Sequence, residues 1–167
     1  MSKNKPVVVI GLMGSGKTTA GRLIAEALGL ELSDSDPYLQ SRYGGTAAEI
    51  ARREGADTLH RYEAEHVLHE LAGEPKVIAA AASTVEDPKV RAALRDPFVV
   101  WVDASDDVLA ERMRSGHHRP DFDPAAMRGR REPFFRAVAD LVADVAALRP
   151  EQVRDAVLRA LGKPAHR

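Results

Sequence analysis

The fold of this chain is decided by the stretch Gly11-Leu12-Met13-Gly14-Ser15-Gly16-Lys17-Thr18. It fits the pattern G-x-x-x-x-G-K-[ST], in which glycines let successive backbone N–H groups curl around phosphate oxygens. In this pattern Lys17 reaches the β- and γ-phosphates, and the hydroxyl of Thr18 ligates magnesium. The alternative is a plain glycine-rich turn. A β-branched run before the loop and helical spacing after it supply the context that the motif requires, so we expect a nucleoside triphosphate to bind here.

Working outward from this loop, strand-like and helix-like segments alternate. Apolar runs predict strands at 6–10, 30–32, 76–80 and 98–103, with an edge strand at 141–145. Apolar periodicity predicts helices at 20–28, 37–43, 46–53, 58–71, 88–95, 106–114, 130–139 and 150–161. This alternation implies right-handed βαβ units, and therefore an α/β fold with a mainly parallel sheet covered by helices on both faces. The segment 115–124 is rich in Gly, His, Pro and Asp, which predicts a mobile loop.

Composition limits the possible partners. The chain has 167 residues, of which 44% are hydrophobic and 29% charged, so we expect one globular domain over 1–167. The formal net charge of -1 gives no electrostatic footprint for nucleic acid or for an anionic membrane. There is no cysteine, no signal-peptide pattern and no apolar stretch long enough to span a bilayer. We therefore expect a cytoplasmic monomer that acts on a small molecule.

The rest of the chain resembles a shikimate kinase over nearly its whole length. The matching elements are Asp34-Ser35-Asp36, the segment 45–56, Arg112 with Arg119-Pro120, Arg131-Glu132-Pro133-Phe134-Phe135, and Arg149-Pro150. The resemblance implies a P-loop kinase fold, with a five-stranded parallel sheet flanked by helices and a mobile lid at about 112–124. It also implies an ATP-dependent phosphotransferase that uses Mg²⁺ and phosphorylates a hydroxyl of shikimate or of a related small cyclitol or polyol.

Motif and resemblance together give the expected site. The catalytic residues would be Lys17, Asp36 and Arg119. The nucleotide would contact Gly11, Met13, Gly14, Ser15, Gly16, Lys17, Thr18, Thr19, Arg112, Arg149 and Pro150. Magnesium would be held by Thr18 and, through water, by Asp34. The acceptor would contact Asp36, His60, Ala81, Ala82, Ser83 and Arg131.

Three departures from the family pattern fall on the acceptor side. Leu59-His60 replaces a Phe-Arg pair whose arginine grips the carboxylate of shikimate in the family. Ala81-Ala82-Ser83 replaces three glycines, so we expect a reshaped turn. The segment between Arg119 and Arg131 is short, and Phe135 replaces a tyrosine. The nucleotide half is thus intact while the acceptor half is altered, and we hypothesise that the best acceptor is a polyol with a weaker or absent negative charge.

Several of these residues also have ordinary structural interpretations. Asp36-Pro37 fits the N-cap and first position of a helix. Arg131 has neighbouring arginines at 128 and 130, so the register of the acceptor-binding arginine is open. Arg119 could be a solvated loop cation, and His60 a surface residue of its helix. The pair His66 and His69 is expected on a solvated helix face, because further zinc ligands are not evident.

Three other functions remain open. A nucleoside monophosphate kinase usually has proline in the phosphate loop, where this chain has Met13-Gly14. A gluconate- or aminocyclitol-type kinase would share the loop and the size of the chain. A non-catalytic nucleotide-binding module, derived from a kinase, is disfavoured by the retention of Lys17, Thr18, Asp36 and Arg119.

Overall fold

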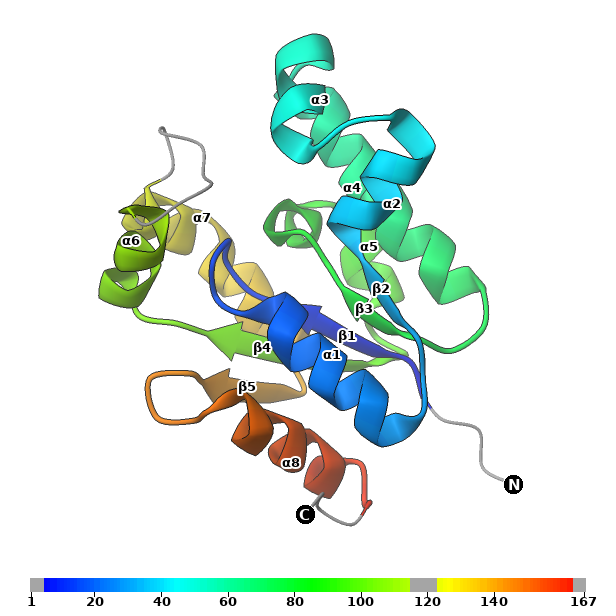
Figure 1. Cartoon of the computed structure of the whole chain (residues 1–167), viewed down its shortest axis with the longest axis vertical. Coiled ribbons are helices and arrows are strands. Elements are labelled where there is room, and N and C mark those ends of the chain that lie inside the picture. The colour runs from blue at the N-terminus through cyan, green and yellow to red at the C-terminus, as the bar shows by residue number, and fades with distance from the viewer. Residues whose placement is uncertain (1–4, 115–122, 164–167) are drawn as a thin grey trace.

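The computed structural model describes residues 5–114 and 123–163 and contains a five-stranded parallel sheet (Figure 1). The strands are β1 (Val7–Ile10), β2 (Leu32–Asp34), β3 (Val77–Ala79), β4 (Phe98–Asp103) and β5 (Leu141–Asp144). Their order is β2-β3-β1-β4-β5, and every neighbouring pair is parallel. This confirms the predicted fold class. The second strand begins at Leu32 rather than at the predicted Leu30.

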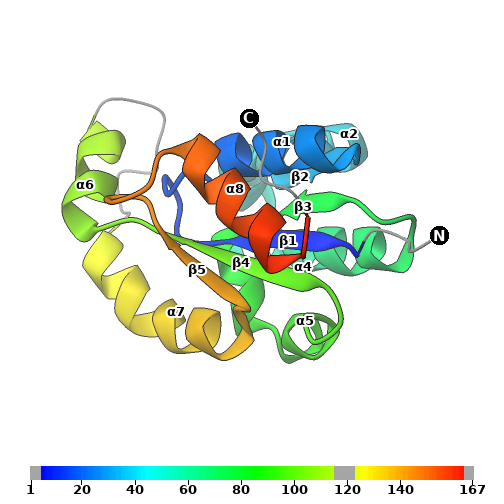
Figure 2. The same cartoon turned by 90° about the horizontal axis from the view of Figure 1, so that it is seen from below.

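Helices cover both faces of the sheet (Figure 2). One face carries α1 (Lys17–Leu28) and α8 (Pro150–Ala160). The opposite face carries α4 (Ala56–Ala72), α5 (Pro88–Ala93), α7 (Pro124–Val138) and the 3₁₀ helix η1 (Ala82–Glu86). The sequence analysis did not predict η1.

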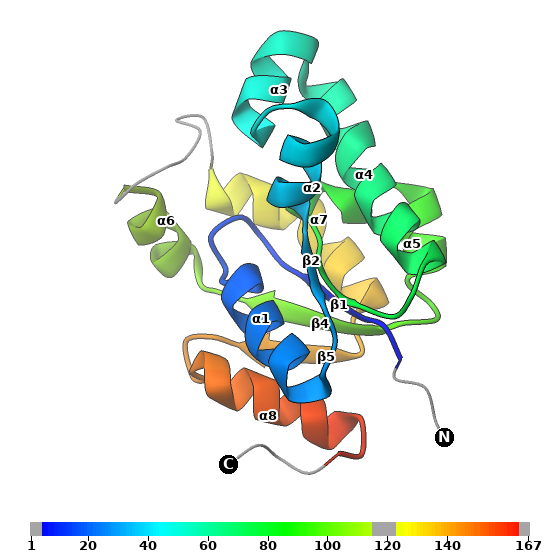
Figure 3. The same cartoon turned by 45° about the vertical axis from the view of Figure 1, so that its right-hand side comes forward.

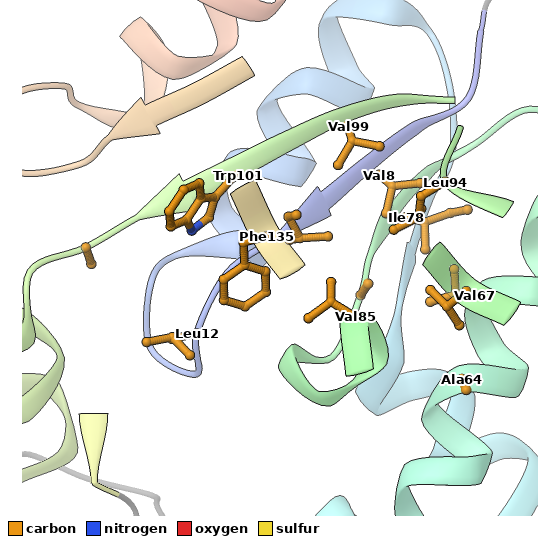
Figure 4. Close-up of a cluster of buried hydrophobic side chains, with 14 of the residues drawn as sticks. Val8, Leu12, Ala64, Val67, Ile78, Val85, Leu94, Val99, Trp101 and Phe135 are labelled. Carbon is orange, nitrogen blue, oxygen red and sulfur yellow. The ribbon is translucent and has the colours of Figure 1, made fainter. Parts of the chain in front are cut away.

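The core is divided between the two faces by the alternation of side chains along each strand. In β1, Val7 and Val9 pack toward α1 and α8, whereas Val8 and Ile10 pack toward α4 and α7. Figure 4 shows the cluster on the side of α4 and α7. In it, Trp101 of β4 lies beside Phe135 of α7 with ring centroids 5.6 Å apart. The central strands are therefore apolar on both faces, as the continuous hydrophobic runs predicted.

A separate cap projects beyond the carboxyl ends of the strands (Figure 3). It consists of α2 (Ser35–Tyr43), α3 (Ala47–Glu54) and the first turns of α4, and it has a small core of its own formed by Leu39, Ile50 and Leu59. On the other side of the phosphate loop lies α6 (Asp106–Arg114). The loop is thus placed between the cap and α6.

Helix α7 begins at Pro124, well before the predicted start near Arg130. Asp123 caps it, because its carboxylate accepts hydrogen bonds from the backbone N–H groups of Ala125 and Ala126 at 3.1 and 3.3 Å. Proline at the first helical position fits this cap. The sequence analysis had assigned these residues to the end of the loop. None of the helices within 5–114 and 123–163 combines the length and the apolar character needed to cross a membrane.

Candidate active site

The phosphate loop between β1 and α1 depends on glycine at specific positions. Gly11 has φ 151°, and a Cβ added there would lie 2.5 Å from the carbonyl oxygen of Val102. Gly14 and Gly16 have φ values of 85° and 97°, a region that side chains disfavour. Gly16 leads into α1 without any side-chain cap. The N-terminal N–H groups of α1 and its positive dipole end are therefore presented to an anion.

Lys17 folds back over this loop. Its Nζ donates hydrogen bonds to the carbonyl oxygens of Gly11 and Leu12 at 2.9 and 3.2 Å. Burial lowers the pKa of Lys17 to about 8, although the carboxylates of Asp34 and Glu63 act in the opposite direction. A phosphate oxygen would offer this ammonium a stronger, charged partner than the two carbonyls.

Thr18 and Asp34 form a pair of oxygen ligands beside the loop. The Thr18 hydroxyl donates to Asp34 Oδ2 at 2.7 Å, which brings the end of β2 next to the start of α1. In the part of the chain that the structure describes, no three histidine or acidic side chains gather into a metal site. Magnesium needs only one or two protein oxygens beside phosphates and water, so this pair fits the ion.

A cavity of about 1070 Å³ joins the phosphate loop to the cap. It opens at the carboxyl ends of β1, β2 and β3, where open α/β sheets bind their ligands. The cavity is lined by Met13, Gly14, Gly16, Lys17, Thr18, Thr19, Asp34, Ser35, Asp36, Pro37, Gln40, Thr46, Ala47, Ala48, Leu59, His60, Glu63, Ala79, Ala80, Ala81, Ala82, Ser83, Arg112 and Arg131. Most of the predicted nucleotide and acceptor residues thus share one space.

Asp36 lies in the first turn of α2 and not at its N-cap, so the structural interpretation of Asp36-Pro37 as a cap is wrong. The helix begins at Ser35, and Asp34 precedes it. Asp34 makes no side-chain cap, and its carboxylate pairs with Thr18 instead. Partial burial raises the pKa of the Asp36 carboxyl and the charge of Asp34 raises it further, while Lys17 opposes both. A carboxylate with a raised pKa is a better proton acceptor.

The turn after β3 forms the opposite wall of the acceptor half. Ala81 has φ -61° and ψ 147°, and among residues 5–114 and 123–163 only glycines have positive φ. Ala82 and Ser83 then enter η1, so the alanines stand in an unstrained conformation. Ser83 Oγ donates to Glu63 Oε1 at 2.8 Å, and both side chains are buried.

Arg131 is the arginine of α7 that lines the cavity, so it is the one in reach of an acceptor. Its side chain is buried, and Nε donates to Glu86 Oε2 at 2.8 Å. Arg130 is exposed and donates to the other oxygen of Glu86 at 2.6 Å. Arg128 points elsewhere and pairs with Asp103 and Asp106 at 2.9 and 2.8 Å.

The comparisons with known proteins agree with this geometry. The sequence profile described as Shikimate kinase matches residues 13–162. A shikimate kinase from Symbiobacterium thermophilum is 40% identical over 143 residues, covering 80% of this chain and 82% of that protein. The chain belongs to the shikimate kinase family. It is an ATP-dependent phosphotransferase of the P-loop kinase fold.

Further relatives of this shikimate kinase family member support the same assignment. A shikimate kinase from Zymomonas mobilis is 32% identical over 164 residues, covering 94% of this chain and 93% of that protein. The fold is that of a shikimate kinase from Acinetobacter baumannii in complex with shikimate, with a TM-score of 0.82 and 24% identity over 94% of this chain and 90% of that one. A gluconokinase from Sinorhizobium meliloti is less similar, with a TM-score of 0.64 and 25% identity over 95% of this chain and 91% of that one.

The structure of this family member places some predicted nucleotide residues and not others. Arg112 lines the cavity and donates to the carbonyl oxygen of Gly14, which holds α6 against the phosphate loop. Arg149 and Pro150 lie exposed at the start of α8 and do not line the cavity. Arg119 and most of the predicted lid lie outside the described residues, so their roles stay predictions.

Two functional candidates escaped the sequence analysis. Glu63 follows His60 by one turn of α4, so the two side chains share a face, and this spacing is the signal that could have identified it. Glu86 sits in the unpredicted η1 and holds Arg131 from a distant part of the chain. No local pattern in the sequence indicates the contact between Glu86 and Arg131.

The predicted solvated face of α4 holds for His69 but is wrong for His66. His66 is completely buried, with Nε2 2.8 Å from Ser33 Oγ and its ring 4.7 Å from that of Tyr38. Burial lowers the pKa of His66 to about 4, so the ring is neutral at physiological pH. His66 therefore ties α4 to β2 as a packing residue.

Proposed function

We propose that this enzyme transfers the γ-phosphoryl group of ATP to a hydroxyl of shikimate or of a related small cyclitol or polyol. The observation that carries the proposal is the single cavity that brings Lys17 of the phosphate loop together with Asp36 of the cap and Arg131 of α7. One space large enough for both partners allows direct, in-line transfer between them. The solved relative from Acinetobacter baumannii, which holds shikimate, supports an acceptor of this size.

On the donor side, the phosphate loop and the start of α1 bind the triphosphate through backbone N–H groups. Lys17 exchanges its two carbonyl partners for the β- and γ-phosphates. Thr18 and Asp34 would hold Mg²⁺, which supplies charge neutralisation on the β- and γ-phosphate oxygens when bound. Arg112 keeps α6 close to the loop. Its planar guanidinium would stack on the adenine.

On the acceptor side, Asp36 orients the reacting hydroxyl and takes its proton. The hydroxyl oxygen forms the new bond to the γ-phosphorus, the bond from that phosphorus to the bridging oxygen breaks, and ADP leaves with the electron pair. His60, Ser83 and Arg131 position the ring, and Ala81 with Ala82 forms its apolar wall. The predicted role of Arg119 is to neutralise charge on the phosphoryl group in transit.

The likeness to a gluconokinase favours one second candidate, a kinase for an open-chain polyol acid. The lower TM-score of that protein makes it the weaker of the two. A nucleotide-binding module without catalysis is disfavoured, because Lys17, Thr18 and Asp36 all line the cavity in an arrangement suited to transfer.

The test is ADP formation from MgATP in the presence of single acceptors: shikimate, quinate, gluconate and aminocyclitols. We expect one cyclic acceptor to stimulate ADP release and to yield a phosphate monoester detectable by ³¹P NMR. Binding of ATP without stimulation by any acceptor would overturn the proposal. Preference for gluconate would favour the second candidate.

A further inference from the structure

The charges that line the acceptor half are mostly negative. Asp36 and Glu63 line this part of the cavity, and Asp34, which pairs with Thr18, lies next to it. Among the cations of the cavity, Lys17 lies in the phosphate loop, where it would bind the phosphates and not the acceptor. A bound carboxylate would therefore lie close to several carboxylates in a partly enclosed space, where like charges repel strongly.

Among residues 5–114 and 123–163, Arg131 is the arginine that lines this half, and it already has an anionic partner. Arg131 gives its Nε to Glu86, with 2.8 Å between the atoms, and its side chain is only 7% exposed. A guanidinium binds a carboxylate most strongly through a two-pronged contact in which its charge is not shared. Because Glu86 takes part of that charge and the Nε donor, Arg131 holds a second carboxylate less strongly than an unshared guanidinium would, while its terminal N–H groups can still donate to hydroxyls.

Ser83 presents an acceptor to the ligand and not a donor. Its single hydroxyl proton is given to Glu63 at 2.8 Å, so the lone pairs of Ser83 Oγ are left to accept. Lone pairs attract an O–H group of a ligand and repel a carboxylate oxygen. His60, which lines the cavity one turn before Glu63, has at most two N–H donors and lacks the planar fork of an arginine.

From these three features we infer that the preferred acceptor is a polyhydroxylated ring without a carboxylate. The inference rests on the proposed function, since it names the class of ring that the kinase phosphorylates. Ser83, His60 and the Arg131–Glu86 pair are the specificity-determining groups. Each of them favours a neutral hydroxyl over an anion at the edge of the ring.

A matched pair of acceptors isolates the charge. One is shikimate, and the other is the same ring with its carboxylate reduced to a hydroxymethyl group. We expect the hydroxymethyl ring to have a kcat/KM at least about tenfold higher, which is the scale of one charge-assisted interaction. Calorimetric titration of both rings into the protein with ADP should show the same preference in Kd.

A charge added at one position should reverse the preference. His60→Arg places a guanidinium beside the ring and should raise kcat/KM for shikimate by roughly 10- to 100-fold. His69→Arg is the matched control, because it adds the same charge to the exposed face of α4 outside the cavity. It should leave kcat/KM unchanged for both shikimate and the hydroxymethyl ring. Circular dichroism of each variant checks that the fold is kept.

The possible outcomes separate the two proposals. If shikimate binds more tightly and turns over faster than the hydroxymethyl ring in the wild type, the inference is overturned while the kinase function stands. If neither these rings nor any other acceptor of the panel is phosphorylated, the proposed function fails, and the order of the two Kd values still decides the inference. If neither ring binds, the inference is overturned, whereas the wider acceptor panel decides the proposed function.

Discussion

The two halves of the cavity are built in different ways. The nucleotide half is built around eight consecutive residues, 11–18, and its geometry is set by backbone conformation at Gly11, Gly14 and Gly16. The acceptor half is made by side chains from α2, α4, α7 and the turn after β3, which are distant in sequence. A backbone site tolerates few substitutions, whereas a side-chain site changes specificity one residue at a time. This difference fits the prediction that the chain keeps the phosphate loop of its family and differs from it around the acceptor.

The strongest test of the comparison is Lys17→Ala in the nucleotide half. We expect kcat to fall on the order of 10³-fold for every acceptor, because a charge on the transferring phosphoryl group is left without its partner. Folding should be little affected, since the hydrogen bonds that Lys17 donates go to carbonyl oxygens of the phosphate loop itself, those of Gly11 and Leu12. Steady-state kinetics and thermal unfolding would be compared with Lys89→Ala, which removes an exposed lysine. Near-normal turnover by folded Lys17→Ala protein would contradict the assignment.

Asp36→Asn should break the acceptor half alone. We expect kcat to fall roughly 10²-fold, because the amide cannot take the proton of the hydroxyl. The KM for ATP should change little, since the loop that holds the phosphates is untouched. Kinetics with ATP and acceptor varied separately would show this split. Asp57→Asn, at an exposed position of α4, serves as the control. If Asp36→Asn also raised the KM for ATP about as much as it lowers kcat, the two halves would not be separable.

His66 should make the stability of the acceptor side sensitive to pH. The pKa of its ring is about 4 in the folded protein and about 6.5 when unfolded, so the unfolded chain binds the extra proton first as the pH falls. Stability is therefore complete above pH 6.5 and is lost as the pH falls toward 4. We expect about 2 kcal/mol less free energy of unfolding at pH 5 than at pH 7.

Urea unfolding at several pH values measures the effect of His66. His66→Gln should flatten the dependence, because glutamine has no proton to gain, whereas His69→Gln should keep it, since His69 is exposed. Equal pH dependence in the wild type and in His66→Gln would show that another group is responsible.

The smallest expected effect concerns the cap. Thr46 accepts from the backbone N–H of Glu49 at 3.1 Å, and Glu49 accepts in return from the N–H of Thr46 at 3.3 Å. Thr46→Ala should cost about 1 kcal/mol, while Thr46→Ser keeps the hydroxyl and most of the stability. Because the core of the cap is small, amide exchange in α3 should quicken more than exchange in α1. Equal acceleration in both helices would argue against a separate cap.

Part of the site could be predicted from sequence because its signals are local. The G-x-x-x-x-G-K-[ST] spacing between a strand and a helix specifies the loop, Lys17 and Thr18 without any distant contact. The central strands β1, β3 and β4 were identified by their continuous apolar runs, since burial on both faces requires such runs. Failures occurred where tertiary contacts decide. Asp36-Pro37 fitted an N-cap by its local pattern, but α2 begins at Ser35, and Asp34 before it pairs with Thr18.

The sequence by itself determined the α/β fold and the phosphate-binding loop, because these follow from hydrophobic period and from a contiguous motif, and its resemblance to shikimate kinases indicated the family. The tertiary structure alone decided which distant side chains meet. It placed Arg131 and not Arg128 or Arg130 in the cavity, paired it with Glu86, and set Ser83 against Glu63. It also buried His66 against Ser33, where helical spacing had indicated a solvated face. Such contacts depend on how helices pack across the sheet, and no spacing within one helix records which residue of another element will face it.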